Sequence, residues 1–177
     1  MPKAPVCEAA IFGETLHKCK LPLRWRQEMT IDGEMKMARP IAATAGQDFE
    51  GGCHCGEVRF RAAGPLREIL MCHCSDCLKI SGTSWGASAA HADGFSWLGE
   101  GRPRWYASSK WAERGFCPTC GSQMFYRRRD LPLISIAPGA FDNSEMLTVS
   151  GQIYAASHPS WGPVGDDLDN LDKSYPE

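Results

Sequence analysis

The sequence predicts a mainly β protein in which zinc pins antiparallel sheets. Many short segments rich in β-branched and aromatic residues follow one another, with Gly and Pro between them, and this pattern is typical of a compact, mainly antiparallel β domain. Seven of the nine cysteines also fall into three tight groups, within residues 53–55, 72–77 and 117–120. Thiolate sulfur is a natural ligand of Zn²⁺, and four thiolates complete a structural site.

Length and charge limit the classes of function. The chain has 177 residues, which suits one domain with its own core, and its formal net charge at pH 7 is -2. We expect no nucleic-acid partner, because no basic stretch is long enough to give a strongly positive face, and no membrane span, because no apolar run is long enough. The first residues lack an apolar signal segment, so we expect a cytoplasmic protein, whose clustered cysteines bind metal rather than form disulfides.

The two ends of the chain differ from its middle. Residues 1–48 carry many charges and no sustained hydrophobic period, so we expect a poorly ordered N-terminal extension in which Cys7 and Cys19 are free thiols. Residues 165–177 are acidic and weakly patterned, and we expect a solvated tail. The predicted zinc domain is therefore residues 49–164. A further hypothesis places the start of translation at Met29, Met35 or Met37.

Residues 53–62 predict the first strand of the domain. Val58 and Phe60 alternate with arginines, which indicates a strand with one buried face. Side chains of an extended segment repeat every two residues, so the sulfurs of Cys53 and Cys55 point to the same side and can bind one ion, while the histidine between them points away.

Residues 67–74 predict the next strand, which ends in the triple cysteine. A short helix over residues 74–80 follows, with Ser75 or Asp76 as its N-cap and Gly82 at its end. Further strands are expected at residues 84–89, 94–98, 104–108, 112–116, 123–128, 133–137 and 146–154.

The segment Cys117-Pro118-Thr119-Cys120-Gly121 predicts a metal-binding knuckle. Its proline fixes one backbone dihedral, and its last glycine lets the chain turn back under the ion. With Cys53 and Cys55 it completes a four-cysteine site, and structural zinc of this kind contributes on the order of 10 kcal/mol to folding. A redox-active Cys-X-X-Cys of the thioredoxin kind is less favoured, because the expected βαβ surroundings are missing.

A second, incomplete set of ligands consists of Cys72, Cys74 and Cys77. The Cys-X-Cys part places two sulfurs on one side, and the following helical turn brings the third beneath them. Three thiolates leave the fourth position of Zn²⁺ open to water or to an incoming thiol, which zinc would hold as a thiolate. From the spacing alone, a second structural site closed by His73 or another side chain is an equal alternative.

Three motifs in this order resemble one family. The motifs are Gly51-Gly52-Cys53-His54-Cys55-Gly56, Cys72-His73-Cys74-Ser75-Asp76-Cys77 and Gly115-Phe116-Cys117-Pro118-Thr119-Cys120-Gly121-Ser122. Over about residues 49–164 the chain is therefore similar to the glutathione-dependent formaldehyde-activating enzymes, a group that also includes centromere protein V.

The resemblance implies an Mss4-like fold with two Zn²⁺ per chain, one structural and one catalytic or labile. The positions that match the family's structural zinc are Cys53, Cys55, Cys117 and Cys120. The positions that match its second zinc, and that would be catalytic, are Cys72, Cys74 and Cys77.

The resemblance also implies an activity. The family joins formaldehyde to glutathione to give S-hydroxymethylglutathione, and it is classed as a carbon–sulfur lyase for the reverse direction. The predicted function is therefore a zinc-dependent carbon–sulfur lyase whose co-substrate, glutathione or a related small thiol, is held at the open three-cysteine zinc. The alternative is a zinc-stapled binding or scaffold module without catalysis, as the centromere relative suggests.

Glutathione carries two carboxylates, so cationic partners are expected. Lys79 lies two residues after Cys77 and is the first candidate for binding glutathione. Arg104 and Lys110 are weaker candidates, because either can be a plain surface charge.

Two positions depart from the pattern of the family. Leu78 follows the third cysteine of the cluster, where family members often have an arginine. Gln152 precedes Ile153, where many members have a histidine, and Trp161 follows later.

Overall fold

A computed structural model describes residues 40–161. The expectations for residues 1–39 and for the acidic tail, residues 165–177, lie outside the described residues. The strands are β1 (Asp48–Gly52), β2 (Arg59–Ala63), β3 (Ile69–Cys72), β4 (Trp85–His91), β5 (Phe95–Leu98), β6 (Arg104–Ala107), β7 (Ala112–Phe116), β8 (Gln123–Arg128), β9 (Leu133–Ile136) and β10 (Val149–Ile153). The helical elements are α2 (Ser75–Ser81) and the 3-10 helices η1 (Ala42–Thr44), η2 (Ala92–Gly94), η3 (Pro138–Ala140) and η4 (Ala155–Ser157). None of the helices in this part of the chain has the length and apolarity that a membrane span requires.

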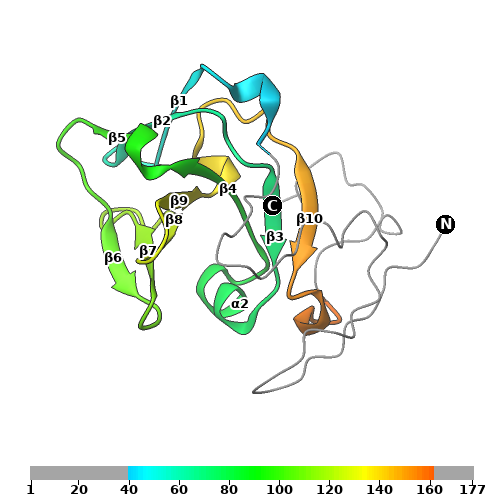
Figure 1. Cartoon of the computed structure of the whole chain (residues 1–177). Coiled ribbons are helices and arrows are strands. Elements are labelled where there is room, and N and C mark those ends of the chain that lie inside the picture. Colours follow the sequence, from blue (N-terminus) through cyan, green and yellow to red (C-terminus); the bar gives the residue numbers. More distant parts are fainter. Residues whose placement is uncertain (1–39, 162–177) are drawn as a thin grey trace, which may run out of the picture.

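The strands form two sheets (Figure 1). One sheet has the order β1-β2-β5, and the other has the order β10-β3-β4-β9-β8-β7-β6. Every pairing is antiparallel except that of β10 with β3, which is parallel. The prediction of a mainly β protein with antiparallel sheets and a short helix is therefore confirmed. The strand itself was predicted, over residues 146–154, but its parallel pairing was not, because β10 pairs with a strand far from it in the sequence.

Strand β1 was not predicted either. Its alternation is real, with Phe49 and Gly51 buried and their neighbours outside, and it pairs with β2 along its whole length. Two glycines in five residues hide this pattern in the sequence.

Residues 40–47, which the sequence analysis placed in the extension, also contact the domain. The Ile41 N–H donates to the Leu66 carbonyl at 2.8 Å, and the buried Thr44 hydroxyl accepts from the Leu66 N–H at 2.8 Å.

The main core joins the two sheets and is centred on Phe60 of β2. The Phe60 ring is fully buried, and the ring centroids of Phe95, Phe125 and Phe141 lie 5.5, 5.3 and 5.5 Å from its own. These rings come from β2, β5, β8 and the segment after η3, so the cluster holds both sheets and that segment together. Edge-to-face aromatic pairs add to the apolar area that such a cluster buries.

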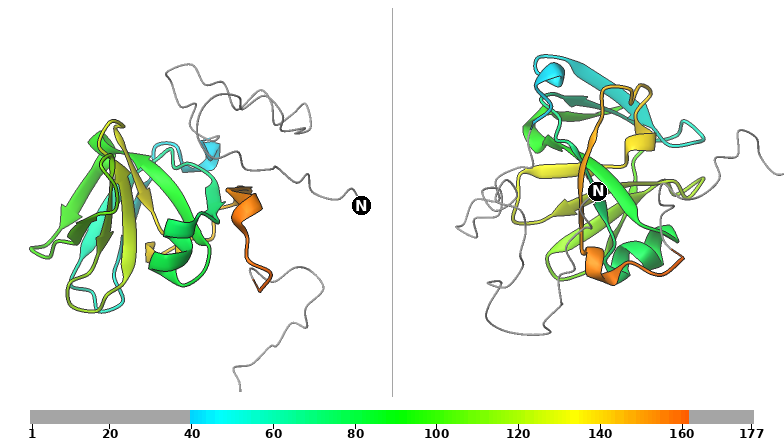
Figure 2. Two further views of the ribbon diagram at one scale, coloured as in Figure 1. Left: turned by 90° about the horizontal axis from the view of Figure 1, so that it is seen from below. Right: turned by 90° about the vertical axis from the view of Figure 1, so that its right-hand side faces the viewer.

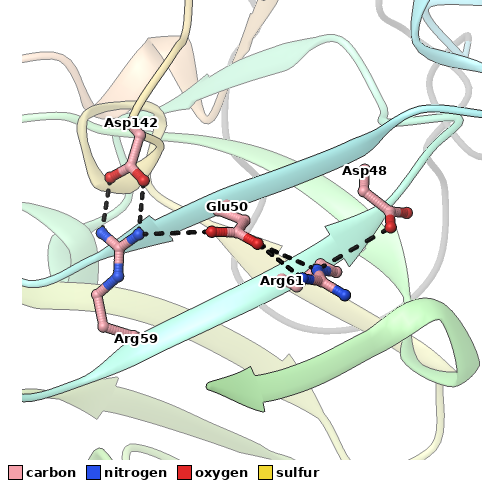
Figure 3. Close-up of polar contacts among 5 residues, drawn as sticks. All are labelled: Asp48, Glu50, Arg59, Arg61 and Asp142. Carbon is pink, nitrogen blue, oxygen red and sulfur yellow. Dashed lines mark hydrogen bonds and ion pairs between the residues drawn. The ribbon is translucent and has the colours of Figure 1, made fainter. Parts of the chain in front are cut away.

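Ion pairs also fix the segment after η3, which contains Asp142, to the outer face of β1 and β2 (Figure 3). Arg59 donates to the two carboxylate oxygens of Asp142 at 2.7 and 2.6 Å, and Arg61 donates to Glu50 at 2.8 Å. The hydrogen bonds from Arg59 lower the pKa of the Asp142 carboxyl below its usual value. Partly exposed pairs of this kind contribute only about 0–1 kcal/mol each. The network therefore orients the segment, while the apolar core stabilises it.

Gly51 makes this packing possible, and we expect Gly51→Ala to destabilise the domain by about 2–3 kcal/mol. An added Cβ would lie 2.1 Å from the Ala140 carbonyl oxygen and 2.6 Å from the Phe60 ring, so the backbone would have to shift. Urea denaturation of the purified protein measures the loss. Gly139→Ala in η3 is the matched control, because nothing lies within 4 Å of its added Cβ, and its effect should stay below about 0.5 kcal/mol. Equal stabilities of the two variants would contradict this account.

Candidate metal centres

Four cysteine sulfurs from two distant segments meet in the structure. The Sγ atoms of Cys53, Cys55, Cys117 and Cys120, the quartet, all lie within 4.8 Å of one another. The Cys55 sulfur is 3.5 Å from that of Cys53 and 3.7 Å from that of Cys117. Such a set can hold a metal ion, because four thiolates complete a tetrahedral site.

A turn, and not a strand, brings the first two sulfurs of the quartet together. β2 begins only at Arg59, and Cys53 and Cys55 precede it in a turn that contains Gly56 at a φ of 78°. The Cys53 N–H donates to the Val58 carbonyl at 3.0 Å, and the Val58 N–H donates to the Cys53 sulfur at 3.3 Å. The prediction of an extended segment over residues 53–58 was therefore wrong. Glycine in the left-handed region bends the backbone around the sulfurs instead.

The second turn of the quartet has the geometry expected of a knuckle. Gly121 adopts a φ of 75°, and the Cys120 N–H points at the Cys117 sulfur at 3.5 Å. The hydroxyl and backbone N–H of Ser122 lower the pKa of Cys120 to about 5. The same hydroxyl accepts from the His54 N–H at 3.1 Å and so joins the two turns. These hydrogen bonds therefore favour the thiolate form of Cys120, which is the form that binds metal.

The sulfurs of Cys72, Cys74 and Cys77, the trio, also lie within 4.8 Å of one another. Cys72 ends β3, and Cys77 lies in the first turn of α2. The trio is thus built by one short segment, in which a strand end and a helix start meet. Three thiolates can hold a metal ion and leave one of its positions free.

The N-cap of α2 differs from the one expected. Cys74 occupies the cap position, and its sulfur accepts from the Cys77 N–H at 3.4 Å. Ser75 and Asp76, which the sequence analysis named as possible caps, are already helical. The prediction was wrong because a sulfur, which lies outside the usual set of capping groups, makes the bond. The end of the helix is as predicted, with Gly82 at a φ of 77°.

His73 is fully buried but does not belong to the trio. Its Nε2 lies 2.7 Å from Oε1 of Gln152 in β10, and its ring centroid is 4.9 Å from that of His158. The His73 N–H donates to the Ile153 carbonyl at 3.0 Å. This residue therefore holds β10 against the end of β3, and its geometry does not support the alternative in which it closes the trio.

Arg114 of β7 is the residue of this site that the sequence analysis missed. Its side chain is only 5% exposed, and its Nη2 donates to the Cys77 sulfur at 3.5 Å. The guanidinium carbon lies 5.8 Å from the Trp85 ring centroid and 5.2 Å from that of Tyr126. No carboxylate within residues 40–161 forms an ion pair with it. A buried cation without an acidic partner requires another anion nearby, and the trio supplies one.

The charge of the trio matches this cation. The hydrogen bond from Cys72 and the hydrogen bond and charge of Arg114 together lower the pKa of Cys77 to about 6, against the effect of burial. The pKa of Cys72 is correspondingly raised. Three thiolates around a divalent ion carry a net charge of about -1, which one guanidinium balances. The donor set and its surroundings therefore fit a metal ion.

A cleft of about 220 Å³ lies next to the trio. Its walls come from α2 and from the β6–β8 part of the large sheet, which the ribbon views show beside each other (Figure 2). The lining residues are Ile80, Tyr106, Arg114, Phe116, Gly121 and Gln123. Arg114 belongs both to the cleft and to the surroundings of Cys77, and Gly121 follows Cys120 of the quartet. The cleft therefore lies between the two groups of sulfurs.

Comparison with known proteins identifies the family. Residues 48–157 match the family described as "Glutathione-dependent formaldehyde-activating enzyme". The chain belongs to this family. Its two sheets, its short helix and its two cysteine clusters agree with the Mss4-like fold that the resemblance implied.

A solved structure resembles this member of the formaldehyde-activating family. It is the crystal structure of a Rhodobacter sphaeroides protein, which is 24% identical, with a TM-score of 0.47, over 58% of this chain and 98% of the other. A likeness of this extent carries no argument about function.

The cations predicted to bind glutathione in this family member are all exposed. Lys79 lies on α2, and side chains two residues apart on a helix do not share a face, so it does not accompany the buried Cys77. Arg104 lies on the edge strand β6, and Lys110 lies in the turn that follows it. Their roles stay predictions, whereas Arg114 is the cation that contacts a sulfur of the trio.

Serine substitutions in the two clusters of this family member should have different effects on metal content and on the fold. We expect Cys72→Ser to lose one of two Zn²⁺ per chain with the fold intact, because the trio is local. Cys117→Ser should lose much of the fold as well, because the quartet joins turns 62 residues apart in sequence. Metal analysis and circular dichroism measure both effects, with Cys19→Ser as a control, because Cys19 belongs to none of the three cysteine motifs of the sequence. A Cys72→Ser protein with the metal content of the wild type would contradict the assignment.

Removal of the Arg114 charge should weaken metal binding at the trio alone. We expect Arg114→Met to raise the dissociation constant of one Zn²⁺ at least about tenfold, because the thiolates lose their cation. Competition with a chromogenic chelator measures this constant. Arg102→Met is the matched control, because Arg102 is exposed and donates to the backbone carbonyls of Gly99 and Gly101, not to a sulfur. An equal loss in both variants would show that Arg114 is not the counter-ion.

Proposed function

We propose that the protein is a zinc-dependent carbon–sulfur lyase that acts on S-hydroxymethylglutathione or a related small thiol adduct. The supporting observation is the trio, whose three sulfurs lie within 4.8 Å of one another beside a buried guanidinium and an open cleft. Membership of the formaldehyde-activating family supports glutathione and formaldehyde as the reactants.

The metal assignment is part of this proposal. We infer that the quartet, Cys53, Cys55, Cys117 and Cys120, holds a structural Zn²⁺, and that the trio, Cys72, Cys74 and Cys77, holds a second one. When bound, the second zinc supplies a positive charge that keeps an incoming thiol deprotonated near neutral pH.

Residues around the trio would position the substrate next to the second zinc. Arg114 balances the thiolates of the trio, and its guanidinium packs against Trp85 and Tyr126. The cleft holds the rest of the thiol substrate, so that its sulfur meets formaldehyde in a fixed position. Catalysis in this proposal is therefore mainly orientation and supply of thiolate.

The bond changes are simple. In the direction of synthesis, the glutathione thiolate attacks the carbon of formaldehyde, a C–S bond forms, and the carbonyl electron pair moves to oxygen, which takes up one proton. The lyase direction reverses each step and releases the thiolate and formaldehyde.

The alternative is a zinc-stapled binding or scaffold module. The quartet alone favours it, because a closed four-sulfur site between two turns has a structural role and no free position. The trio favours the enzyme, because no fourth ligand joins its three sulfurs within residues 40–161 and because a cleft shares Arg114 with it.

Turnover of S-hydroxymethylglutathione, followed by NMR, tests the proposal. We expect the wild-type protein to accelerate formation and cleavage of the adduct, and Cys72→Ser to return the rate to the uncatalysed one while fold and one Zn²⁺ remain. Absence of turnover in the wild type would favour the module. So would an unchanged visible absorption of the cobalt-substituted protein on addition of glutathione.

A further inference from the structure

The cleft beside the trio contains polar atoms that the described protein leaves without partners. They are Nε2 and Oε1 of Gln123 and Nε and Nη1 of Arg114, all buried and without a hydrogen-bond partner among residues 40–161. Buried polar groups nearly always have partners, and one left unpaired costs about 1–3 kcal/mol. Both side chains line the same cleft. Their free donors and acceptor therefore indicate that a ligand completes them.

A β-bulge places Gln123 in this position. The register of β7 and β8 shifts between Gly115, which pairs with Phe125, and Phe116, which pairs with Gln123, so that Met124 is the extra residue. As a result the consecutive residues Met124 and Phe125 both pack in the main core. Gln123 consequently lines the cleft together with Arg114 and Phe116. Bulges near functional sites often redirect a side chain in this way.

The unpaired atoms define the chemistry of the ligand. The amide of Gln123 offers two N–H donors and one carbonyl acceptor, which are complementary to the C=O and N–H of a peptide group. The guanidinium of Arg114 offers donors only and matches an oxygen acceptor. Ile80, Tyr106 and Phe116 add apolar surface on the other sides. This combination suits the backbone of a short peptide, whereas a simple thiol such as 2-mercaptoethanol has no amide to pair with both the N–H and the C=O of the Gln123 side chain.

We propose that Gln123 is a specificity residue that hydrogen-bonds a peptide group of the thiol substrate, so that the site selects peptide thiols over thiols without an amide. This inference rests on the proposed function, because it places the thiol of that substrate at the trio. Arg114 assists by donating to an oxygen of the same peptide.

Binding of S-methylglutathione by isothermal titration calorimetry tests the inference without turnover. This probe keeps the peptide but has no thiol to ionise. We expect it to bind the zinc-loaded wild type, and to bind Gln123→Leu about tenfold more weakly, because one buried hydrogen-bonded contact is lost. Gln123→Ala carries the same expectation should the leucine variant fail to fold. Gln47→Leu is the matched control, because Gln47 is an exposed glutamine whose amide donates to the Ala43 carbonyl away from the cleft.

Kinetics provide the second measurement. In Gln123→Leu the KM for S-hydroxymethylglutathione should rise about tenfold with kcat unchanged, whereas both constants for the 2-mercaptoethanol adduct should stay as in the wild type. A general distortion of the site would instead change both substrates alike, and that result would overturn the inference.

The outcomes separate this inference from the proposed function. In one outcome, the wild type binds S-methylglutathione, Gln123→Leu binds it more weakly, and neither protein shows lyase turnover. This result would support the contact between Gln123 and the peptide and would contradict the lyase activity. If the wild type and Gln123→Leu turn over S-hydroxymethylglutathione with the same KM, the lyase activity is supported and the contact between Gln123 and the peptide is overturned. Equal binding of S-methylglutathione by wild type and variant, or no binding by the wild type, would also overturn it.

Discussion

The meeting of two turns, one at Cys53 and Cys55 and the other at Cys117 and Cys120, is the constraint on which the rest of the structure depends. Cys55 and Cys117 are 62 residues apart, yet their sulfurs lie 3.7 Å from each other. Closing a flexible loop of this length costs about 4 kcal/mol in chain entropy. Zinc binding to four thiolates, as proposed, would offset this cost with on the order of 10 kcal/mol. The loop so closed contains the trio, α2 and most strands of the large sheet.

The two sulfur clusters differ in their surroundings in a way that agrees with different roles. Around the quartet, the hydrogen bonds that reach sulfur come from backbone N–H groups and from the Ser122 hydroxyl, which are neutral donors. Around the trio, the Cys77 N–H donates to the Cys74 sulfur, and the guanidinium of Arg114, which packs near Trp85 and Tyr126, adds a charged donor to the Cys77 sulfur. Because Arg114 carries a permanent positive charge, the charge balance around the trio depends on whether a neutral or an anionic ligand occupies the fourth position of a bound metal ion. The cleft shares Arg114 with the surroundings of the trio.

Most of the fold could be predicted because the strands from residue 84 onward are short segments bounded by turn residues, and because Gly82 ends the helix through its own backbone freedom. Three features could not be predicted in this way. Strand β1 has glycine where alternation needs an apolar side chain, since Phe60 fills the space. The parallel pairing of β10 depends on contacts with β3 that no local pattern encodes. Arg114 looks like any strand arginine, because its sulfur partner is 37 residues away. The cysteine groups themselves were visible from spacing, but the turn at Cys53 and the cap at Cys74 were not.

The cap of α2 has a consequence for how the protein withstands oxidation. The sulfur of Cys74 starts a helix of seven residues, which is too short to persist without its tertiary contacts, and the same helix carries Ile80 into the wall of the cleft. A disulfide between Cys74 and a neighbouring thiol would weaken that sulfur as an acceptor, and the first turn would fray. Formation of such a disulfide within the trio takes up two of its three sulfurs, so one oxidation would remove two ligands and a wall of the cleft together. Both sheets would stay folded, and reduction by a cellular thiol would reverse the damage.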